Sequence, residues 1–325
     1  MTTCLVALGA NLGQRRAALS RAVDLLRQAP HIHDLRVSRW LETPPVATPD
    51  SQDPFLNGAL RLETTRPPED LLDLLLQIED DLGRRRDVRW GARAIDLDLL
   101  LYGEQIVQSP RLQVPHPWMA VRRFVLAPAV EVAAEMIHPQ IGWSVSRLLE
   151  HLNSAAEYVA LTGVAAAVVE RIAGAVAARC GWNLLRDPVG EATSASAPVY
   201  EQAPVYEREA SLLSRRAGAI AEAGVSPSNR VLSAFWVEQS LACGLLTQSQ
   251  REALSRQIQA ARQTAASPKL VVLLKPREGA ASSSAEAIEL ERLAARPGRG
   301  PFLVLDDEPE ERAVTEVLAA LEAMD

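Results

Sequence analysis

Two aspartates alternate with apolar residues in the segment Ile95-Asp96-Leu97-Asp98-Leu99. Successive side chains of a β-strand point to opposite faces, so Asp96 and Asp98 share one face, about 7 Å apart. Two carboxylates this close repel each other unless a positive charge lies between them. Mg²⁺ commonly binds one or two carboxylates together with substrate phosphates, which makes the pair a candidate metal site. The alternative is the solvated outer face of an antiparallel sheet.

Arginines gather directly upstream of this pair and are interleaved with a tryptophan: Arg84, Arg85, Arg86, Arg89, Trp90 and Arg93. The guanidinium fork matches phosphate oxygens, and arginines beside metal-binding carboxylates are parts of a phosphoryl-transfer site. His116 stands between two prolines downstream, as a candidate ligand contact or as a structural residue. Together these features predict a nucleotide-dependent transferase.

Composition excludes several other classes of protein. The 325 residues carry 41 acids against 34 bases, for a net charge of −7, which argues against a general nucleic-acid binder. Three scattered cysteines make neither a disulfide framework nor a metal cluster. The N-terminus lacks a signal peptide, and no apolar run is long enough to span a bilayer. We therefore expect a cytoplasmic protein that contacts neither membrane nor nucleic acid.

The elements that must position these residues follow from periodicity and helix-end signals. For residues 1–150 the pattern predicts an α+β ferredoxin-like sandwich. Its strands are expected at 3–9, 34–42, 55–64 and 94–102, and its helices at 15–28, 67–82 and 144–152.

From about residue 158 the pattern restarts, which places domains at 1–153 and 157–325. Strands separated by helices predict a parallel α/β sheet in the second domain. Its strands are expected at 158–163, 269–274 and 302–305, and its helices at 165–180, 208–223, 229–244, 248–265 and 309–323.

The order of motifs in the first domain resembles the 6-hydroxymethyl-7,8-dihydropterin pyrophosphokinase family. The matching segments are Ala7–Gly13, Glu42–Pro45, Phe55–Asn57, Ile78–Arg84, Arg89–Arg93, Ile95–Asp98, Val114–His116 and Arg122–Pro128. The resemblance implies that MgATP transfers pyrophosphate to the hydroxymethyl group of the pterin, leaving AMP, in folate biosynthesis. It also implies that Asp96 and Asp98 bind two Mg²⁺ ions.

The resemblance further implies the roles of single residues. The catalytic set would be Arg84, Trp90, Arg93, Asp96, Asp98 and His116. The ATP side would add Glu79, Arg111 and Arg122 to His116. The pterin pocket would be lined by Thr43, Pro44, Val46, Phe55, Asn57 and Phe124. Departures from the family pattern are an arginine loop about one residue shorter, Pro117 after His116, and Ala10 where serine is common.

The second domain is diffusely similar to deoxynucleoside kinases, through Leu161-Thr162-Gly163, Phe235–Leu241 and Pro268–Leu274. A phosphate loop needs a second glycine, a lysine and a hydroxyl residue, where this chain has Val168, Val169 and Glu170. We therefore expect this domain to have lost nucleotide phosphorylation and to serve regulation, dimerisation or docking of a folate-pathway partner. The alternatives are a wholly non-catalytic scaffold, or a second domain that retains nucleoside binding.

Overall fold

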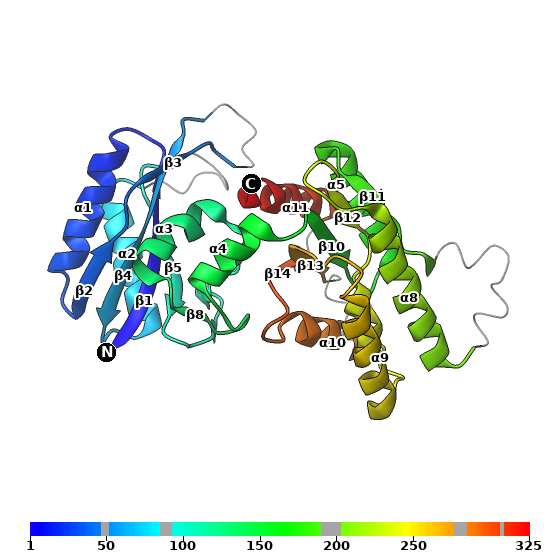
Figure 1. The fold of residues 1–325 in the computed structure, drawn as a ribbon. Helices are drawn as coiled ribbons and strands as arrows, with labels where there is room; N and C mark the ends of the chain where they lie inside the picture. The colour runs from blue at the N-terminus through cyan, green and yellow to red at the C-terminus, as the bar shows by residue number, and fades with distance from the viewer. Residues whose placement is uncertain (47–51, 85–92, 190–202, 276–284, 306–308) are drawn as a thin grey trace. The chain divides into compact units, whose positions relative to one another are not determined.

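The computed structural model describes residues 1–46, 52–84, 93–189, 203–275, 285–305 and 309–325 (Figure 1). The chain divides into two compact units. The first unit comprises Met1–Asn153 with Ala319–Asp325, and the second comprises Ser154–Leu318. The predicted boundary near residues 153–157 stays a prediction, and the grouping differs from it in placing the last turns of the chain with the first unit.

The first unit is built on an antiparallel sheet in the order β2-β4-β1-β5, with β3 also paired to β4. Its strands are β1 (Thr2–Ala10), β2 (Ile32–Val37), β3 (Leu41–Thr43), β4 (Phe55–Thr64) and β5 (Asp96–Tyr102). This is the predicted α+β architecture. Two short antiparallel pairs lie outside the sheet: β6 (Val107–Gln108) with β7 (Gln113–Val114), and β8 (Ile137–His138) with β9 (Trp143–Ser144).

Helices α1 (Arg15–Gln28) and α2 (Pro68–Asp81) cover one face of this sheet, because each buries an apolar stripe against it. Helix α2 begins with a proline and two acids, which suit the positive end of a helix dipole. Helix α3 (Arg123–Ala133) contacts β4 and β1. The unit also contains a 3₁₀ turn, η1 (Met119–Val121), and helix α4 (Val145–Ser154).

The structure breaks one strand that periodicity predicted as continuous, dividing it into β2 and β3. Val37 lies opposite Leu60 and Leu41 lies opposite Asn57, so Ser38–Trp40 face only two residues of β4. Three residues against two make a β-bulge, which bends a strand and re-aims its side chains. Below, the segment Ser38–Trp40 is called the bulge.

Helix α3 was not predicted, for two physical reasons. Pro128 lies inside it, and proline usually ends or kinks a helix. Apolar residues also occur almost throughout its sequence, so that no amphipathic period stands out.

The second unit contains a parallel sheet in the order β11-β12-β10-β13-β14, which confirms the α/β prediction. Its strands are β10 (Tyr158–Thr162), β11 (Asn183–Leu185), β12 (Val231–Ser233), β13 (Leu270–Leu274) and β14 (Phe302–Leu305). Its helices are α5 (Ala166–Cys180), α8 (Val205–Ala223), η2 (Val237–Ala242), α9 (Gln248–Ala261) and α10 (Ala285–Ala294). Helix α11 (Glu310–Met324) begins in this unit and ends in the residues grouped with the first.

The helix predicted over 229–244 is wrong. The structure has strand β12 there, followed by the 3₁₀ segment η2. All three residues of β12 are buried between β10 and β11, so pairing inside the sheet overrides the local helical pattern. Strand β11 and helix α10 were not predicted.

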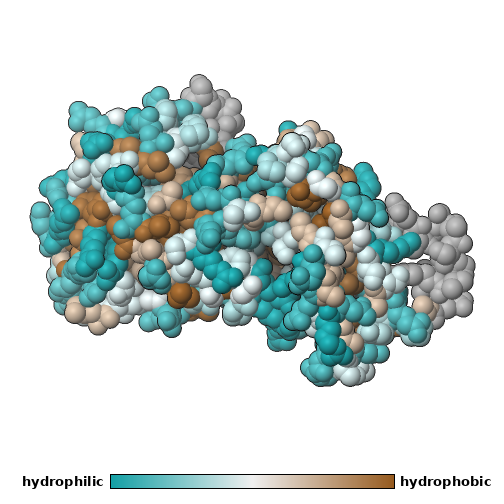
Figure 2. Space-filling view, viewed as in Figure 1, coloured by the Kyte–Doolittle hydropathy of each residue, from teal (hydrophilic) through white to brown (hydrophobic). Residues whose placement is uncertain are grey.

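Among the described residues, no helix combines the length and hydropathy needed to cross a membrane. The face seen in Figure 2 is largely hydrophilic, with smaller hydrophobic patches over the first unit.

Candidate active site

The two aspartates lie on β5 opposite the smallest residues of β1. Asp96 is opposite Gly9, and Asp98 is opposite Ala7. Gly9 is also opposite Asn57 on β4, so Asp96, Gly9 and Asn57 form one row across three strands. A Cβ atom added to Gly9 would lie 3.4 Å from Asn57 Oδ1 and 3.9 Å from Asp96 Cβ. Because Gly9 has no side chain, this face of the sheet is open between the carboxylate of Asp96 and the amide of Asn57.

Two predicted arginines hold the carboxylate of Asp96. Arg84 Nη1 lies 2.8 Å from Asp96 Oδ1, and Arg93 pairs with Asp96 Oδ2. Burial and the neighbouring charge of Asp98 raise the pKa of Asp96, while Arg93 and Arg84 oppose that shift. The pKa of Asp96 is raised on balance, and the two arginines favour the ionised form that can bind a cation.

Glu79 ties helix α2 to this strand. It is fully buried, and its Oε1 accepts a hydrogen bond of 2.6 Å from the backbone N–H of Leu97. The same carboxylate pairs with Arg84. Burial raises the pKa of Glu79, and the Leu97 bond and Arg84 counteract it. Glu79 therefore sits beneath the aspartate pair and orients Arg84, instead of facing solvent.

A cavity of about 100 Å³ opens beside Asp96 and Asp98. All six residues predicted for the pterin pocket line it, together with Arg93, Arg122 and both aspartates. These six are Thr43, Pro44, Val46, Phe55, Asn57 and Phe124. The structure thus brings the predicted pterin residues and the predicted metal ligands into one space.

The amide of Asn57 has a defined orientation inside this cavity. Asn57 is 6% exposed, and its Nδ2 donates a hydrogen bond of 2.8 Å to Thr43 Oγ1. Arg122 lies over two rings, 5.8 Å from the centre of Phe124 and 5.3 Å from that of Trp118. Aromatic walls with an amide at one end suit a flat heterocycle that has donors and acceptors at its edge.

His116 is held neutral next to the site. Burial and the charge of Arg122 lower the pKa of His116 to about 3. Its Nδ1 accepts a hydrogen bond of 3.1 Å from the N–H of Trp118, which assigns the ring proton to Nε2. The imidazole can therefore donate a hydrogen bond to an anionic oxygen without being charged.

Three predicted residues, Glu79, Arg84 and His116, do not line the cavity themselves but lie beside residues that do. Two others have no place at the cavity in this structure. Arg111 is exposed and pairs with Asp73 of helix α2, and it does not line the cavity. Trp90 lies outside the described residues, with the other members of the arginine loop between Arg84 and Arg93.

The structure adds one residue to which the sequence analysis gave no role. Asn11 is 1% exposed, and its Oδ1 accepts a hydrogen bond of 2.6 Å from the N–H of Arg93. The backbone N–H of Asn11 donates in return to the carbonyl of Arg93, at 2.9 Å. Its Nδ2 donates to Gln52 Oε1 at 3.0 Å. An asparagine at a glycine-flanked strand end was the available signal, since such residues often bond to backbone.

The donor set at this site fits a hard cation. Asp96 and Asp98 supply carboxylate oxygens from one strand face, and substrate phosphates commonly complete such a set for Mg²⁺. No cluster of three or more potential metal ligands occurs within the part of the chain that the structure describes.

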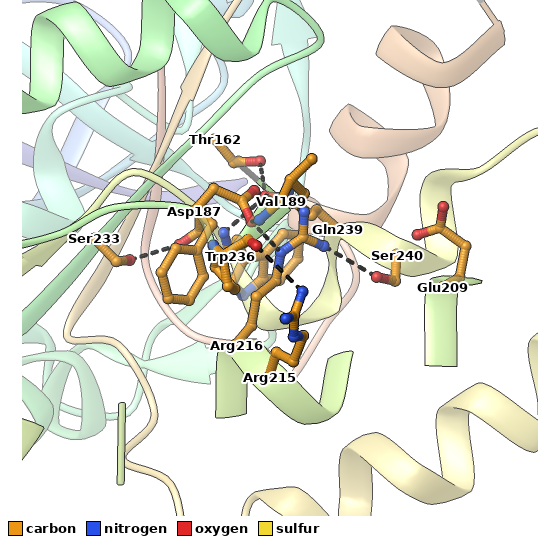
Figure 3. A network of polar contacts seen from close by, with 12 residues as sticks. Thr162, Asp187, Val189, Glu209, Arg215, Arg216, Ser233, Trp236, Gln239 and Ser240 are labelled. Atoms are coloured by element: carbon orange, nitrogen blue, oxygen red, sulfur yellow. Dashed lines mark hydrogen bonds and ion pairs between the residues drawn. The ribbon is translucent and has the colours of Figure 1, made fainter. Parts of the chain in front are cut away.

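The strand ends of the second unit carry a different polar network, shown in Figure 3. Arg216 is 4% exposed, and it binds Asp187 Oδ2 at 2.7 Å and Ser240 Oγ at 3.0 Å. Gln239 Oε1 accepts from Thr162 Oγ1, at 2.9 Å, and from the N–H of Trp236. The donors and acceptors of this network thus bind one another.

The turn after β10, where a phosphate loop would lie, is filled by protein atoms. A Cβ atom at Gly163 would lie 2.6 Å from the carbonyl oxygen of Leu274 and 3.3 Å from Val169 Cγ2. Val169 is buried, and Glu170 accepts hydrogen bonds from Arg186 and from the N–H of Asp187. An apolar side chain and a carboxylate thus stand where a phosphate loop has a lysine and a hydroxyl.

Comparisons with known proteins find relatives of the first unit. Residues 5–134 match the family model described as 7,8-dihydro-6-hydroxymethylpterin-pyrophosphokinase (HPPK). The 2-amino-4-hydroxy-6-hydroxymethyldihydropteridine pyrophosphokinase of Bacillus subtilis is 45% identical over 131 residues, which are 40% of this chain and 78% of that protein. The protein of the same name from Pseudomonas aeruginosa is 43% identical over 134 residues, 41% of this chain and 82% of the relative.

Among solved structures, a deoxyadenosine kinase from M. mycoides aligns with 49% of this chain and 96% of its own, at a TM-score of 0.38 and 13% sequence identity. The pyrophosphokinase relatives settle the family of the first unit, as the order of motifs predicted. The chain belongs to the 7,8-dihydro-6-hydroxymethylpterin-pyrophosphokinase family.

Proposed function

We propose that the cavity of the first unit binds 6-hydroxymethyl-7,8-dihydropterin beside MgATP, and that Asp96 and Asp98 hold the metal ions. The family activity is the ATP-dependent pyrophosphokinase step of folate biosynthesis. The observation that carries the assignment of residues is the row of Asp96, Gly9 and Asn57. In this row only β1 separates β5, which carries the aspartates, from β4, which carries Asn57, and this supports a metal side and a pterin side on one face of the sheet.

The cations would act by neutralising and orienting the transferred phosphoryl groups. Of the chain's own residues, Arg84 and Arg93 already lie against Asp96 and can exchange its carboxylate for phosphate oxygens once metal binds there. His116 Nε2–H adds a neutral donor, since its proton is retained on the uncharged ring. Two Mg²⁺ ions are the expected number.

On the other side, Phe55 and Phe124 would stack on the pterin ring, and Asn57 would bind its edge. The bond from Asn57 Nδ2 to Thr43 fixes the amide, so its Oδ1 is available to accept a hydrogen bond from an amino group of the pterin. Thr43, Pro44 and Val46 would close the pocket over the ring.

Release of AMP from ATP and 6-hydroxymethyl-7,8-dihydropterin by the purified full-length chain tests this proposal. We expect AMP formation that depends on both the pterin and Mg²⁺. AMP release that ignored the pterin, or none at all, would refute the proposal. Asp98→Asn is expected to lose the Mg²⁺-dependent release of AMP. Asp73→Asn is a matched surface control, because Asp73 is exposed and pairs with Arg111 away from the cavity.

The second unit is proposed to be non-catalytic and to serve regulation, dimerisation or docking of a folate-pathway partner. The filled turn at Gly163 and the buried Val169 support this. Titration calorimetry of the full chain with a non-hydrolysable ATP analogue and Mg²⁺ should give one nucleotide per chain. A second nucleotide per chain, or phosphorylation of a deoxynucleoside, would favour the alternative that the unit retains nucleoside binding.

A further inference from the structure

The three residues of the bulge contact two neighbouring elements, β4 and α3. Ser38 bonds to Ala59 of β4 twice, through its N–H to the carbonyl and through its Oγ from the N–H, both at 2.9 Å. Arg39 binds Glu131 of α3 with its backbone N–H, at 2.9 Å, and with its guanidinium, at 2.9 and 3.2 Å. Trp40 packs its ring on β4 at Gly58.

The contact between Trp40 and Gly58 is unusually close. A Cβ atom at Gly58 would lie 2.5 Å from both Cε3 and Cζ3 of the indole ring, so only glycine admits the ring at this distance. Side chains alternate along a strand, so the ring lies against the face of β4 opposite to the one that carries Asn57. Trp40 packs against the hydrophobic core beneath α1 and α2, and Asn57 lines the cavity.

The elements that the bulge contacts are those that form the walls of the cavity. Strand β3 carries Thr43, strand β4 carries Phe55 and Asn57, and helix α3 carries Phe124. We propose that the bulge is a positioning element for the pterin pocket, in which the Trp40 ring seated on Gly58 sets how β3 lies on β4. The proposal rests on the proposed function, because it takes the pterin to be the ligand of this cavity.

The packing of the Trp40 ring on Gly58 affects the shape of the pocket through the pairing of β3 with β4. Leu41 follows Trp40 directly and is opposite Asn57, and Thr43 is opposite Phe55. A methyl group at Gly58 must displace the ring or the strand, because protein cores accommodate added atoms only by shifting their neighbours. Either shift moves Thr43 relative to Asn57 and disturbs their hydrogen bond of 2.8 Å. The aspartates lie on β5, on the far side of β1, and keep their positions.

The test measures ligand binding to the full chain by calorimetry, using 6-hydroxymethylpterin with a saturating non-hydrolysable ATP analogue and Mg²⁺. Gly58→Ala is expected to raise the Kd of the pterin about tenfold or more. Its Kd for the ATP analogue should stay within about twofold, since a shift confined to β3 and β4 leaves the aspartates in place. Gly218→Ala is the matched control, since a Cβ atom there has nothing within 4 Å.

Trp40→Leu removes both ring carbons and provides the second arm. Alone, this variant should weaken pterin binding about fivefold, because no indole ring packs on Gly58 to hold β3 against β4. Combined with Gly58→Ala, it should bind the pterin more tightly than Gly58→Ala alone, because the added methyl no longer meets a ring. If Gly58→Ala does not fold, Trp40→Leu and the double variant still decide the matter.

Pterin affinity within about twofold of wild type in both Gly58→Ala and Trp40→Leu would overturn the proposal. So would a double variant as weak as the product of the two single effects, or an equal loss of ATP-analogue binding. Failure of the wild-type chain itself to bind the pterin would instead refute the proposed function, so the two failures are distinguishable.

Discussion

Replacing Asn11 by alanine tests whether the residue that follows β1 positions Arg93. The change removes the acceptor of the 2.6 Å bond from the N–H of Arg93 and the donor of the 3.0 Å bond to Gln52. It keeps the backbone bond from residue 11 to the carbonyl of Arg93. One lost hydrogen bond costs about 1 kcal/mol, and an amide left unsatisfied in a largely buried place costs about 1–3 kcal/mol. Together we expect about 2–4 kcal/mol.

That free energy divides between stability and turnover. If half of it holds Arg93 against Asp96 in the reacting complex, kcat falls about tenfold, and if all of it does, by about a hundredfold. The assay is steady-state AMP release at saturating substrates, with the midpoint of urea unfolding measured alongside. Asn11→Asp keeps an acceptor for Arg93 but cannot donate to Gln52, so it should lie between wild type and Asn11→Ala. Asn183→Ala, at an exposed asparagine of the second unit, is the matched control. Turnover of Asn11→Ala within twofold of wild type would refute the reasoning.

Three further changes test other parts of the structure. Asp96→Asn should reduce AMP release at least a hundredfold at saturating Mg²⁺, since it removes a carboxylate from the metal side, and unchanged turnover would disprove the metal assignment. His116→Gln should flatten the acid side of the stability curve. Because the pKa of His116 is lowered to about 3, the unfolded chain binds a proton that the folded chain does not between pH 6.5 and pH 3, and stability falls as pH falls through that window. Urea unfolding at several pH values measures this. Between pH 6.5 and pH 3 the free energy of unfolding of the variant should fall by about 1.4 kcal/mol per pH unit less than that of wild type. An equal dependence on pH in the two proteins contradicts the prediction. Arg216→Ala should destabilise the second unit by about 3–5 kcal/mol, because Asp187 is left buried and unpaired, whereas Arg216→Met with Asp187→Leu should unfold close to wild type. An Arg216→Ala variant as stable as wild type in urea would show that the pair stabilises nothing.

The sequence predicted those parts of the site that depend on local period. Alternation alone put Asp96 and Asp98 on one strand face, and the apolar stripes of α1 and α2 located the helices that bury the sheet. The elements it missed depend on contacts between distant residues. Three residues form the bulge at Ser38–Trp40 because Gly58 leaves room for the indole ring of Trp40. The sequence around either residue does not indicate this contact, because Trp40 lies in the bulge and Gly58 lies on β4.

The same reason explains the other differences. Strand β12 forms because β10 and β11 pair with it on both sides, although its own segment has a helical pattern. Asn11 belongs to the site because Arg93 lies 82 positions along the chain and bonds to it. Arg111 was expected on the ATP side through the family resemblance, and in this structure it pairs with Asp73 on the surface.

In the proposed complex, the position of Gly9 between Asp96 and Asn57 makes β1 a spacer between the two substrates. Strands are spaced about 4.8 Å apart, so two spacings, roughly 10 Å, separate the backbone that carries the acids from the backbone that carries the amide. The reacting atoms of the two substrates must meet at about 3–3.5 Å within that interval, above a residue with no side chain. A branched side chain at position 9 would stand between the two walls, with its Cβ atom 3.4 Å from Asn57 Oδ1 and 3.9 Å from Asp96 Cβ. Gly9→Val is therefore expected to give a protein that holds donor and acceptor together and transfers nothing, which would make the bound pair accessible to structure determination with ATP itself.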